Sequence, residues 1–301
     1  MTEHFDWDHL QSFLAVARSG RLTEAARRLG IEHTTLSRRI AGLEGQLRSK
    51  LFDRSSRGYS LTAQGERLFE HAQTIESLML NAVAEIADSS VQVAGNVRVG
   101  APDGFGTQFL APRFGKIVDE HPGLAVQLVT MPRVFSLTKR EADIAVALAR
   151  PNTGRHHARK LTDYELGLYG SVEYLAAHPP VSDRADLKRH RFIGYVEDLI
   201  YAPELDYLPL VSTDIQPRLS YSSIIAQHSA TIAGLGLCVL PVFLVGNDSR
   251  LVRLLSHEVT LIRSFWLVVH DDIRSLARVR VVSEFIAQEV AGARGLFLPG
   301  K

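Results

Sequence analysis

The first part of the chain repeats apolar residues with the spacing of amphipathic helices. A first helix is predicted to end around residues 19–20, and its buried stripe consists of Leu10, Phe13, Leu14 and Ala17. A second, short helix is predicted to be capped by Thr23, and its inner face consists of Ala25, Ala26 and Leu29. After Gly30, a third helix has the apolar face Leu36, Ile40, Leu43 and Leu47. Two helices joined by a short glycine-containing turn predict a helix-turn-helix.

The opposite face of the third helix is small and basic. In a projection at about 100° per residue, the outward residues are Thr34, Arg38, Ala41 and Gly45. Thr35 and Gly42 lie beside this face. Small residues would allow the helix backbone to approach the wall of a DNA groove closely. Thr34, Thr35 and Arg38 would then reach base edges. His33 and Arg39 would reach the shoulders or phosphates. The alternative is a solvated helix, but such helices usually carry Glu/Lys pairs. We expect Glu32 to serve the helix N-terminus.

Residues 51–62 form two short, apolar-ended runs around a basic turn that contains Gly58. This pattern predicts a β-hairpin wing. Arg54 and Arg57 at its tip would lie beside a duplex and contact phosphate or the minor groove.

A long helix is predicted to follow, with Thr62 as its cap, because only Gly65 interrupts the chain before Gly95. Its apolar residues have heptad spacing and are Leu68, Ala72, Ile75, Met79, Ala82 and Ile86. Such a seam packs either against a partner helix or onto its own domain.

From Asn96 the pattern changes to alternating strands and helices, which indicates α/β architecture. Strands are predicted at 97–100, 124–129 and 143–147, a crossing strand at 161–169 and a return crossing at 264–270. Helices are predicted at 109–121, 172–177, 224–233 and 275–290.

Charge is distributed unevenly along the chain. Residues 1–57 hold ten Lys and Arg against seven acids, whereas the remainder holds 24 against 26. A polyanion would therefore be attracted to one end only, although a solvated surface gives the same count. The one cysteine, Cys238, excludes an intrachain disulfide and favours a reducing, cytoplasmic compartment. We expect no signal peptide and no membrane segment, since Gly234, Gly236 and Pro241 interrupt the longest apolar stretch.

The sequence contains few signs of enzyme chemistry. His156 and His157 are adjacent but have no third ligand at metal spacing, and Cys238 lies in an apolar setting that disfavours a thiolate. Gly104-x-Gly106 and Gly234-x-Gly236 lack the third glycine of a dinucleotide site. We expect no catalytic residue, no cofactor and no metal.

The N-terminal motifs together resemble the DNA-binding domain of LysR-type transcriptional regulators. The matching segments are Leu10-x-x-Phe13, Ala25-Ala26-x-x-Leu29, Leu36-Ser37-x-x-Ile40-x-x-Leu43-Glu44-x-x-Leu47, Leu51-Phe52-x-Arg54 and Leu61-Thr62-x-x-Gly65. Many members open the recognition helix with Ser-Gln-Pro-Ala or Ser-Gln-Ser-Ala, where this chain has Glu32-His33-Thr34-Thr35. The expected DNA-binding residues are His33, Thr34, Thr35, Arg38, Arg39, Arg54 and Arg57.

The remaining length resembles the effector domain of the same family, which is similar to type 2 periplasmic binding proteins. The resemblance rests on segments 95–100, 142–145, 191–195 and 233–241. It implies a small molecule in a cleft between subdomains, near strand ends and helix N-termini. The expected effector-binding residues are Asp103, Thr107, Arg133, Ser222 and Ser223. Each has a structural alternative, such as a turn for Asp103 or a helix cap for either serine. Asp103 would disfavour a plain carboxylate unless Arg133 compensates.

The predicted fold is all-α plus α/β, with a winged helix-turn-helix at 1–62, a dimerising helix at 63–92 and a two-subdomain effector domain at 93–301. Subdomain I would comprise 93–162 and 267–301, and subdomain II 163–266. The resemblance implies a sequence-specific transcriptional regulator whose partners are double-stranded DNA, a small-molecule effector, further copies of itself as a homodimer or homotetramer, and RNA polymerase. The alternatives are a ligand-binding protein or enzyme without a DNA-binding role, and a DNA-binder that senses nothing.

Overall fold

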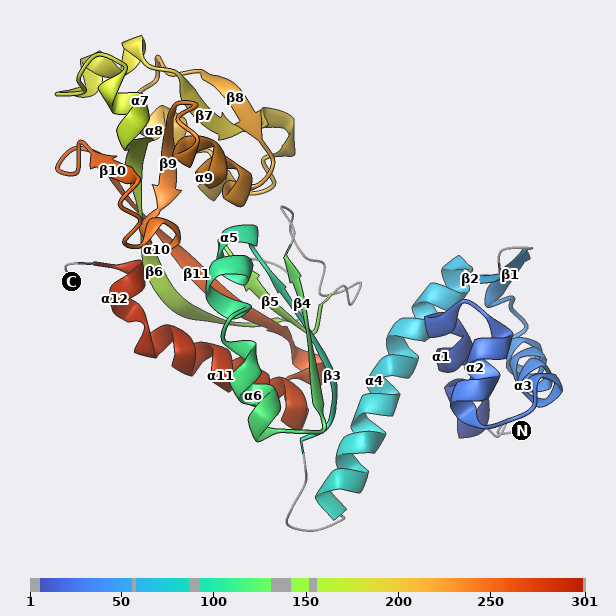
Figure 1. The fold of residues 1–301 in the computed structure, drawn as a ribbon. Coiled ribbons are helices and arrows are strands. Elements are labelled where there is room, and N and C mark those ends of the chain that lie inside the picture. Colours follow the sequence, from blue (N-terminus) through green and yellow to red (C-terminus); the bar gives the residue numbers. More distant parts are fainter. Residues whose placement is uncertain (1–5, 56–57, 87–92, 131–141, 152–155, 300–301) are drawn as a thin grey trace. The chain divides into compact units, whose positions relative to one another are not determined.

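The computed structural model describes residues 6–55, 58–86, 93–130, 142–151 and 156–299 (Figure 1). Two compact units make up the chain, Met1–Val91 and Gln92–Lys301. Each has its own apolar core. We describe the two units separately.

The first unit is a helical body with a two-stranded hairpin. Its helices are α1 (Trp7–Ser19), α2 (Leu22–Leu29), α3 (His33–Gln46) and α4 (Ala63–Ile86). The antiparallel hairpin consists of β1 (Phe52–Ser55) and β2 (Gly58–Leu61). Fully buried Leu10, Phe13, Leu36 and Leu43 join α1 to α3, because their apolar stripes face each other. The predicted helix-turn-helix and wing are thus confirmed.

Two local predictions in this unit were wrong. Helix α2 already begins at Leu22, after Arg21 as the N-cap residue, so Thr23 lies within the first turn and does not cap it. Helix α3 ends at Gln46, and Leu47 is 41% exposed instead of belonging to the buried face. The chain leaves the helix there through Arg48, whose φ of 48° does not continue an α-helix.

Two glycines let the hairpin pack closely against the helices. Gly58 has a φ of 128°, and a Cβ there would lie 2.4 Å from the carbonyl oxygen of Gly20. At Gly65, in the first turn of α4, a Cβ would lie 2.1 Å from the carbonyl oxygen of Leu51. The Thr62 hydroxyl accepts a hydrogen bond from the Gly65 amide at 3.0 Å, which confirms the predicted cap of α4.

The heptad seam of α4 divides into two halves. Its first residues pack onto the core of the first unit, where Ala72 is fully buried and Leu68 is half-buried. Farther along, the seam is exposed at Ile75, Met79 and Ala82. The side chain of Ile86 lies outside the described residues. Packing onto its own domain is therefore confirmed for the first part of the seam, whereas a partner helix along the exposed part stays a prediction.

The second unit is built on one mixed sheet of the order β4-β3-β5-β11-β6-β9-β7-β8, with β10 paired to β6. The strands are β3 (Gly95–Ala101), β4 (Leu124–Thr130), β5 (Ile144–Ala147), β6 (His156–Ser171), β7 (Phe192–Tyr195), β8 (Pro217–Tyr221), β9 (Leu237–Pro241), β10 (Leu251–Leu254) and β11 (Thr260–His270). The helices are α5 (Asp103–Phe105), α6 (Phe114–Glu120), α7 (Val172–Ala176), α8 (Leu208–Val211), α9 (Ile224–Ile232), α10 (Val242–Val245), α11 (Ala277–Gly292) and α12 (Arg294–Phe297). Alternating strands and helices confirm the predicted α/β architecture.

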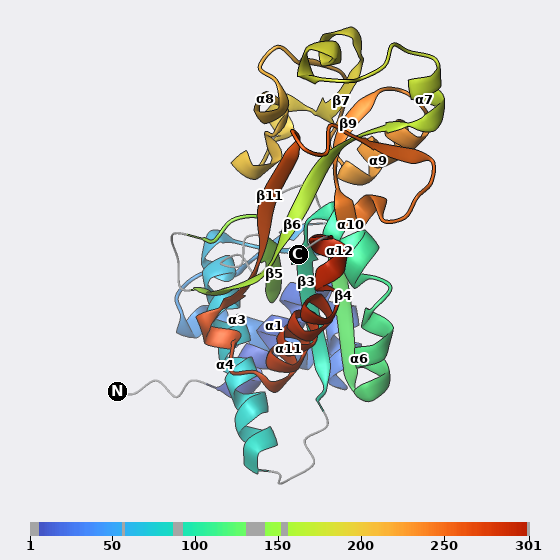
Figure 2. The same ribbon diagram turned by 90° about the vertical axis from the view of Figure 1, so that its left-hand side faces the viewer.

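The sheet is shared by two lobes, which the long antiparallel strands β6 and β11 connect (Figures 1 and 2). The first lobe contains β3, β4 and β5 with α6 and α11. The second lobe contains β7, β8 and β9 with α7, α8 and α9. The predicted crossing and return strands correspond to β6 and β11, although both are longer than expected.

The helix predicted over residues 109–121 was wrong in its form. The chain after β3 instead makes the short α5, a π-helical turn over Gly106–Leu110, and α6. Pro112 lies between the last two, and its missing amide proton interrupts the helical hydrogen-bond pattern. Gly106 packs tightly, since a Cβ there would lie 2.3 Å from Thr130 Cγ2.

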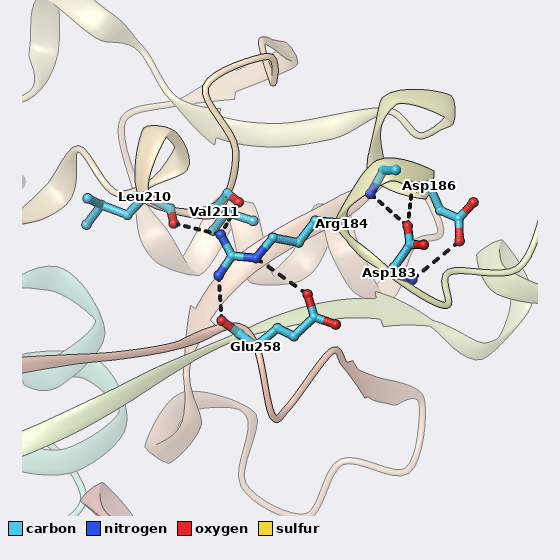
Figure 3. A network of polar contacts seen from close by, with 7 residues as sticks. Asp183, Arg184, Asp186, Leu210, Val211 and Glu258 are labelled. Atoms are coloured by element: carbon cyan, nitrogen blue, oxygen red, sulfur yellow. Dashed lines mark hydrogen bonds and ion pairs between the residues drawn. The ribbon is translucent and has the colours of Figure 1, made fainter.

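Arg184 joins three segments of the second lobe (Figure 3). Its Nη1 donates to the carbonyl oxygen of Val211 at 2.8 Å, and its Nη2 donates to that of Glu258 at 2.6 Å. The Glu258 carboxylate lies 3.6 Å from Nε. A capping box of Asp183 and Asp186 holds the 3₁₀ turn Arg184–Arg189 that carries this arginine.

Candidate functional site

Helix α3 presents a polar face to solvent. Leu36 is fully buried, and the exposed residues on the opposite side are Thr34, Arg38, Ala41 and Gly45. His33 is exposed at the shoulder, and Thr35 is half-buried. A Cβ added at Gly45 would meet nothing within 4 Å, so the backbone there is open to a close approach. The observed exposure agrees with the projection from the sequence. The surface offers hydroxyls, an imidazole and a guanidinium for base and phosphate contacts.

Two residues near this face, Arg39 and Gly42, have contacts within the unit. Arg39 forms an ion pair with Asp8 of α1 at 2.7 Å. At Gly42, a Cβ would lie 3.1 Å from the His9 ring, so this glycine permits close packing of α1 on α3. Glu32 is the N-cap residue of α3, so it lies at the helix N-terminus as expected, but its side chain makes no capping hydrogen bond. Its backbone is extended and its side chain is exposed to water.

The wing carries Arg54, which is half exposed. Its guanidinium carbon lies 5.4 Å from the centre of the Tyr59 ring, and its Nη2 lies 3.9 Å from the Glu44 carboxylate. These contacts orient the side chain along the hairpin. Arg57, the other predicted wing contact, lies outside the described residues.

Glu44 is a buried residue that the sequence reasoning quoted only as part of a motif. Its carboxylate accepts hydrogen bonds from the Leu51 amide at 2.9 Å, the Phe52 amide at 3.3 Å and Lys50 Nζ at 2.9 Å. Burial alone would raise the pKa of Glu44, but the bonds from Lys50 and from the two amides lower it below its ordinary value of 4.5. Glu44 thereby fixes the start of the wing to the end of α3. The sequence did contain a signal for this buried residue, because a glutamate lies within the apolar face of the helix.

A cavity of about 40 Å³ lies between the two lobes of the second unit. Its wall is mostly apolar and aromatic and consists of Pro102, Asp103, Gly104, Phe105, Leu148, Tyr164, Leu166, Tyr195, Tyr201, Leu205, Tyr207, Ser222, Ile224, Pro241, Phe243 and Phe265. The lining residues come from segments on both lobes and on the connecting strands. An apolar cavity with a few polar groups is the usual form of a small-molecule site.

The predicted effector residues are only partly brought together. Asp103 and Ser222 line the cavity, and the hydroxyl of Ser223 donates a hydrogen bond to the Asp103 carboxylate. The same hydroxyl accepts a bond from the Ala226 amide at 3.2 Å, so Ser223 also caps α9. Thr107 is exposed on the π-helical turn and is not part of the cavity wall. Arg133 lies outside the described residues.

Four tyrosines of the wall were missed by the sequence reasoning. Burial and the nearby Asp103 carboxylate raise the pKa of Tyr201 to about 12. Burial also raises the pKa of Tyr164, Tyr195 and Tyr207. Tyr207 is 3% exposed, and in the described part of the chain its hydroxyl has no hydrogen-bond partner of good geometry. Tyr195, Tyr201 and Tyr207 recur every six residues, which was the only visible signal.

Other reactive groups are buried or dispersed. Cys238 is fully buried, which raises the pKa of its thiol to about 12 and keeps the thiolate unpopulated at neutral pH. Among the described residues, no three His, Cys, Asp or Glu side chains gather as a metal ion would require. In the same part of the chain, no helix has the length and apolar character needed to cross a bilayer.

The fold and these two sites define a protein in which a winged helix-turn-helix is combined with a two-lobed α/β ligand-binding unit. Residues 7–66 match the bacterial regulatory helix-turn-helix protein, lysR family, and residues 90–291 match the LysR substrate binding domain. The chain therefore belongs to the LysR family of transcriptional regulators.

Similar proteins agree with this assignment. The HTH-type transcriptional regulator PtxR of Pseudomonas aeruginosa is 29% identical over 259 residues, which cover 84% of this chain and 82% of PtxR. The regulator CrgA of Neisseria meningitidis serogroup C is 28% identical over 292 residues, 94% of this chain and 96% of CrgA. A solved CrgA structure matches with a TM-score of 0.58 at 27% identity and covers 95% of this chain and 99% of that one. ArgP of Mycobacterium tuberculosis, at 19% identity, shares the fold with a TM-score of 0.72 over 96% of this chain and 98% of its own.

The family settles the class of function. The chain is a DNA-binding transcriptional regulator that responds to effectors, and it is not an enzyme. Members of the family bind DNA and effector ligands and form oligomers. A ligand-binding protein or enzyme without a DNA-binding role is set aside, because both parts of the chain match the regulator.

Proposed function

We propose that α3 enters the major groove and that Thr34, Thr35 and Arg38 read base edges there. His33 lies at the shoulder of this surface, while Arg54 and Arg57 contact phosphate or the minor groove. The observation that carries this assignment is the exposed polar face of α3 opposite fully buried Leu36. Arg39 has to release Asp8 before it can contact phosphate, so we assign it the smallest contribution.

Variants of Arg38 and Arg54 would distinguish contacts with DNA bases from contacts with the DNA backbone. Sites would be selected from genomic fragments with the full-length protein, and binding would be measured against a scrambled duplex. For Arg38→Ala we expect a loss of discrimination of about ten- to a hundredfold. For Arg54→Ala we expect weaker binding to both duplexes and a lower salt dependence. Lys188→Ala, an exposed cation of the second lobe, is the control. Unchanged discrimination by Arg38→Ala would refute the assignment.

We also propose that the outer half of α4 pairs two copies of the chain. Exposed Ile75, Leu78 and Met79 form an apolar stripe there, and a twofold dimer suits DNA sites with two half-sites. Met79→Glu should shift the sedimentation coefficient towards the monomer, whereas Gln64→Glu, at an exposed position in the first turn, should leave it unchanged. A dimer that survives both Ile75→Glu and Met79→Glu would rule out this seam.

Family membership supports the remaining parts of the proposal. Residues 1–62 act as the DNA-binding domain, 63–92 as the dimerising helix and 93–301 as the effector domain, in a homodimer or homotetramer that also contacts RNA polymerase in the cytoplasm. The single cysteine is compatible with that reducing compartment.

We propose the interlobe cavity as the effector site, with Asp103, Ser222 and Ser223 at its polar end. A ligand there would shift the balance between arrangements of the lobes and so change operator affinity. No contact is assigned to Thr107, which is not part of the wall, or to Arg133, which lies outside the described residues. The test is operator affinity with and without a ligand that raises the melting temperature of the protein. Equal affinity in both states would exclude effector control.

A further inference from the structure

The cavity wall contains one charged side chain among the residues that the structure describes, and it is the acidic Asp103. Asp103 is partly exposed to the cavity, and its negative charge contributes to the raised pKa of both Tyr201 and Tyr195. The one charge that the described wall carries is therefore negative. A carboxylate in an apolar cavity favours a positively charged ligand over an anion.

The place where an anionic ligand would usually bind is already taken by Asp103. Ser222 and Ile224, at the N-terminus of α9, line this end of the cavity, and helix N-termini favour anions. Here the Ser223 hydroxyl caps the helix and donates a hydrogen bond to the Asp103 carboxylate. Helix α5 also packs directly on α9, since a Cβ at Gly104 would lie 2.8 Å from Ile224 Cγ2. The chain's own carboxylate thus lies where an anionic ligand would otherwise approach the helix.

The rest of the wall suits an apolar ring that carries a hydrogen-bonding group. The buried hydroxyl of Tyr207 interacts with Tyr195 but makes no hydrogen bond of good geometry among the described residues, and buried polar groups are normally paired. The phenol rings of Tyr195 and Tyr201 offer faces that attract cations. The cavity of about 40 Å³ must widen even for one ring, which limits the ligand to a small molecule.

We propose that this cavity binds a small aromatic amine in its protonated form, with the ammonium group at Asp103 and the ring among the tyrosines, and that it rejects the corresponding carboxylate. This inference rests on the proposed effector role of the cavity. It adds the charge and the size of the ligand, which are inferred from the residues that line the cavity.

The test uses three probes that each contain one ring. They are benzylamine, which is positively charged near neutral pH, the neutral benzyl alcohol, and the negatively charged benzoate. Thermal shift and calorimetry would be performed with the full-length protein near neutral pH. Wild-type protein should bind benzylamine most tightly and benzoate most weakly. Asp103→Asn should weaken benzylamine binding by about tenfold and leave benzyl alcohol nearly unchanged. The control Asp119→Asn makes the same charge change on the exposed face of α6 and should alter neither.

Several outcomes would overturn the proposal. Benzoate binding as tightly as benzylamine to the wild type would do so without any variant, which matters if Asp103→Asn folds poorly. Equal effects of Asp103→Asn and Asp119→Asn, or no binding of any probe at millimolar concentration, would also overturn it.

A parallel measurement separates this inference from the proposed function. Operator binding would be measured with and without benzylamine. If benzylamine binds in the expected order but operator affinity stays constant, the ligand class is supported and effector control through this cavity fails. If operator affinity responds to benzoate instead, effector control stands and the ligand class is wrong.

Discussion

The DNA-binding face and the interlobe cavity are assembled in opposite ways. The face of α3 takes its side chains from fourteen consecutive residues and directs them into solvent. The cavity takes its side chains from segments spread between residues 102 and 265 and directs them inward. The hydrogen bond between Asp103 and Ser223, for example, joins residues 120 positions apart. One site is a property of a single helix, whereas the other is a property of the packed lobes.

Because of this difference, residues of the DNA-binding face can be replaced with little effect on the stability of the fold, whereas residues of the cavity wall cannot. Arg38 and Thr34 are exposed, so replacing them removes little packing. The cavity wall is also the core of the second unit, because Phe105, Tyr164 and Phe265 belong to its main apolar cluster. Changes to the cavity therefore alter the fold as well as the ligand site.

The largest expected effect is at Phe105, where cavity and core coincide. Its ring contacts four others, including Phe265 at a centroid distance of 4.5 Å. Phe105→Ala should lower the free energy of unfolding of the second unit by about 3 to 5 kcal/mol. Hydrogen exchange in α1–α3 should stay unchanged because the first unit has its own core. Phe105→Leu is the milder control, and an equal loss of protection in α1–α3 would show that the two units do not unfold independently.

Glu44→Gln should destabilise the first unit by about 2 kcal/mol at neutral pH, because a charged acceptor of backbone amides is replaced by a neutral one. The lowered pKa means that the wild-type carboxylate stabilises the fold fully above its ordinary value of 4.5. This contribution disappears as the pH falls through the lower folded-state pKa. Urea unfolding followed in the first unit at several pH values should show the difference between variant and wild type shrinking in acid. A pH-independent difference would contradict the role of this carboxylate.

Arg184→Lys tests a polar link in the second lobe that lies away from the cavity wall. A lysine retains the charge but cannot bond two separated carbonyl oxygens in a planar geometry. We expect a loss of about 1 kcal/mol, measured by urea unfolding, with the benzylamine affinity of the folded protein unchanged. Lys188→Arg, on the same 3₁₀ turn, serves as a control. A large change in ligand affinity would mean that this link also shapes the cavity.

The smallest effect is expected for Arg39→Ala. Its ion pair with Asp8 is partly exposed at the surface, and such pairs contribute less than about 1 kcal/mol. Unfolding should change within that limit, and operator affinity should fall much less than for Arg38→Ala. If the two variants lose equal discrimination between operator and scrambled DNA, the division between outward Arg38 and paired Arg39 is incorrect.

Local periodicity was sufficient for much of the fold. The helices α1 and α3, the hairpin, the cap at Thr62 and the crossing strands all follow from patterns within a few residues. Local patterns failed at Leu47, where tertiary packing decided the boundary, whereas the break at Pro112 follows from proline itself and was a local signal. They also could not divide the α4 seam, because the burial of Ala72 depends on the position of α1.

What the sequence determined by itself is the family and the outward chemistry of α3, since both depend on residues that are neighbours in the chain. What only the tertiary structure decided is the site between the lobes. No local pattern places Asp103 against Ser223, brings Tyr164 together with Tyr201 and Tyr207, or leaves Thr107 outside the wall. The physical reason is that a cavity consists of the space that distant segments leave between them, and that space exists only after β6 and β11 have joined the two lobes.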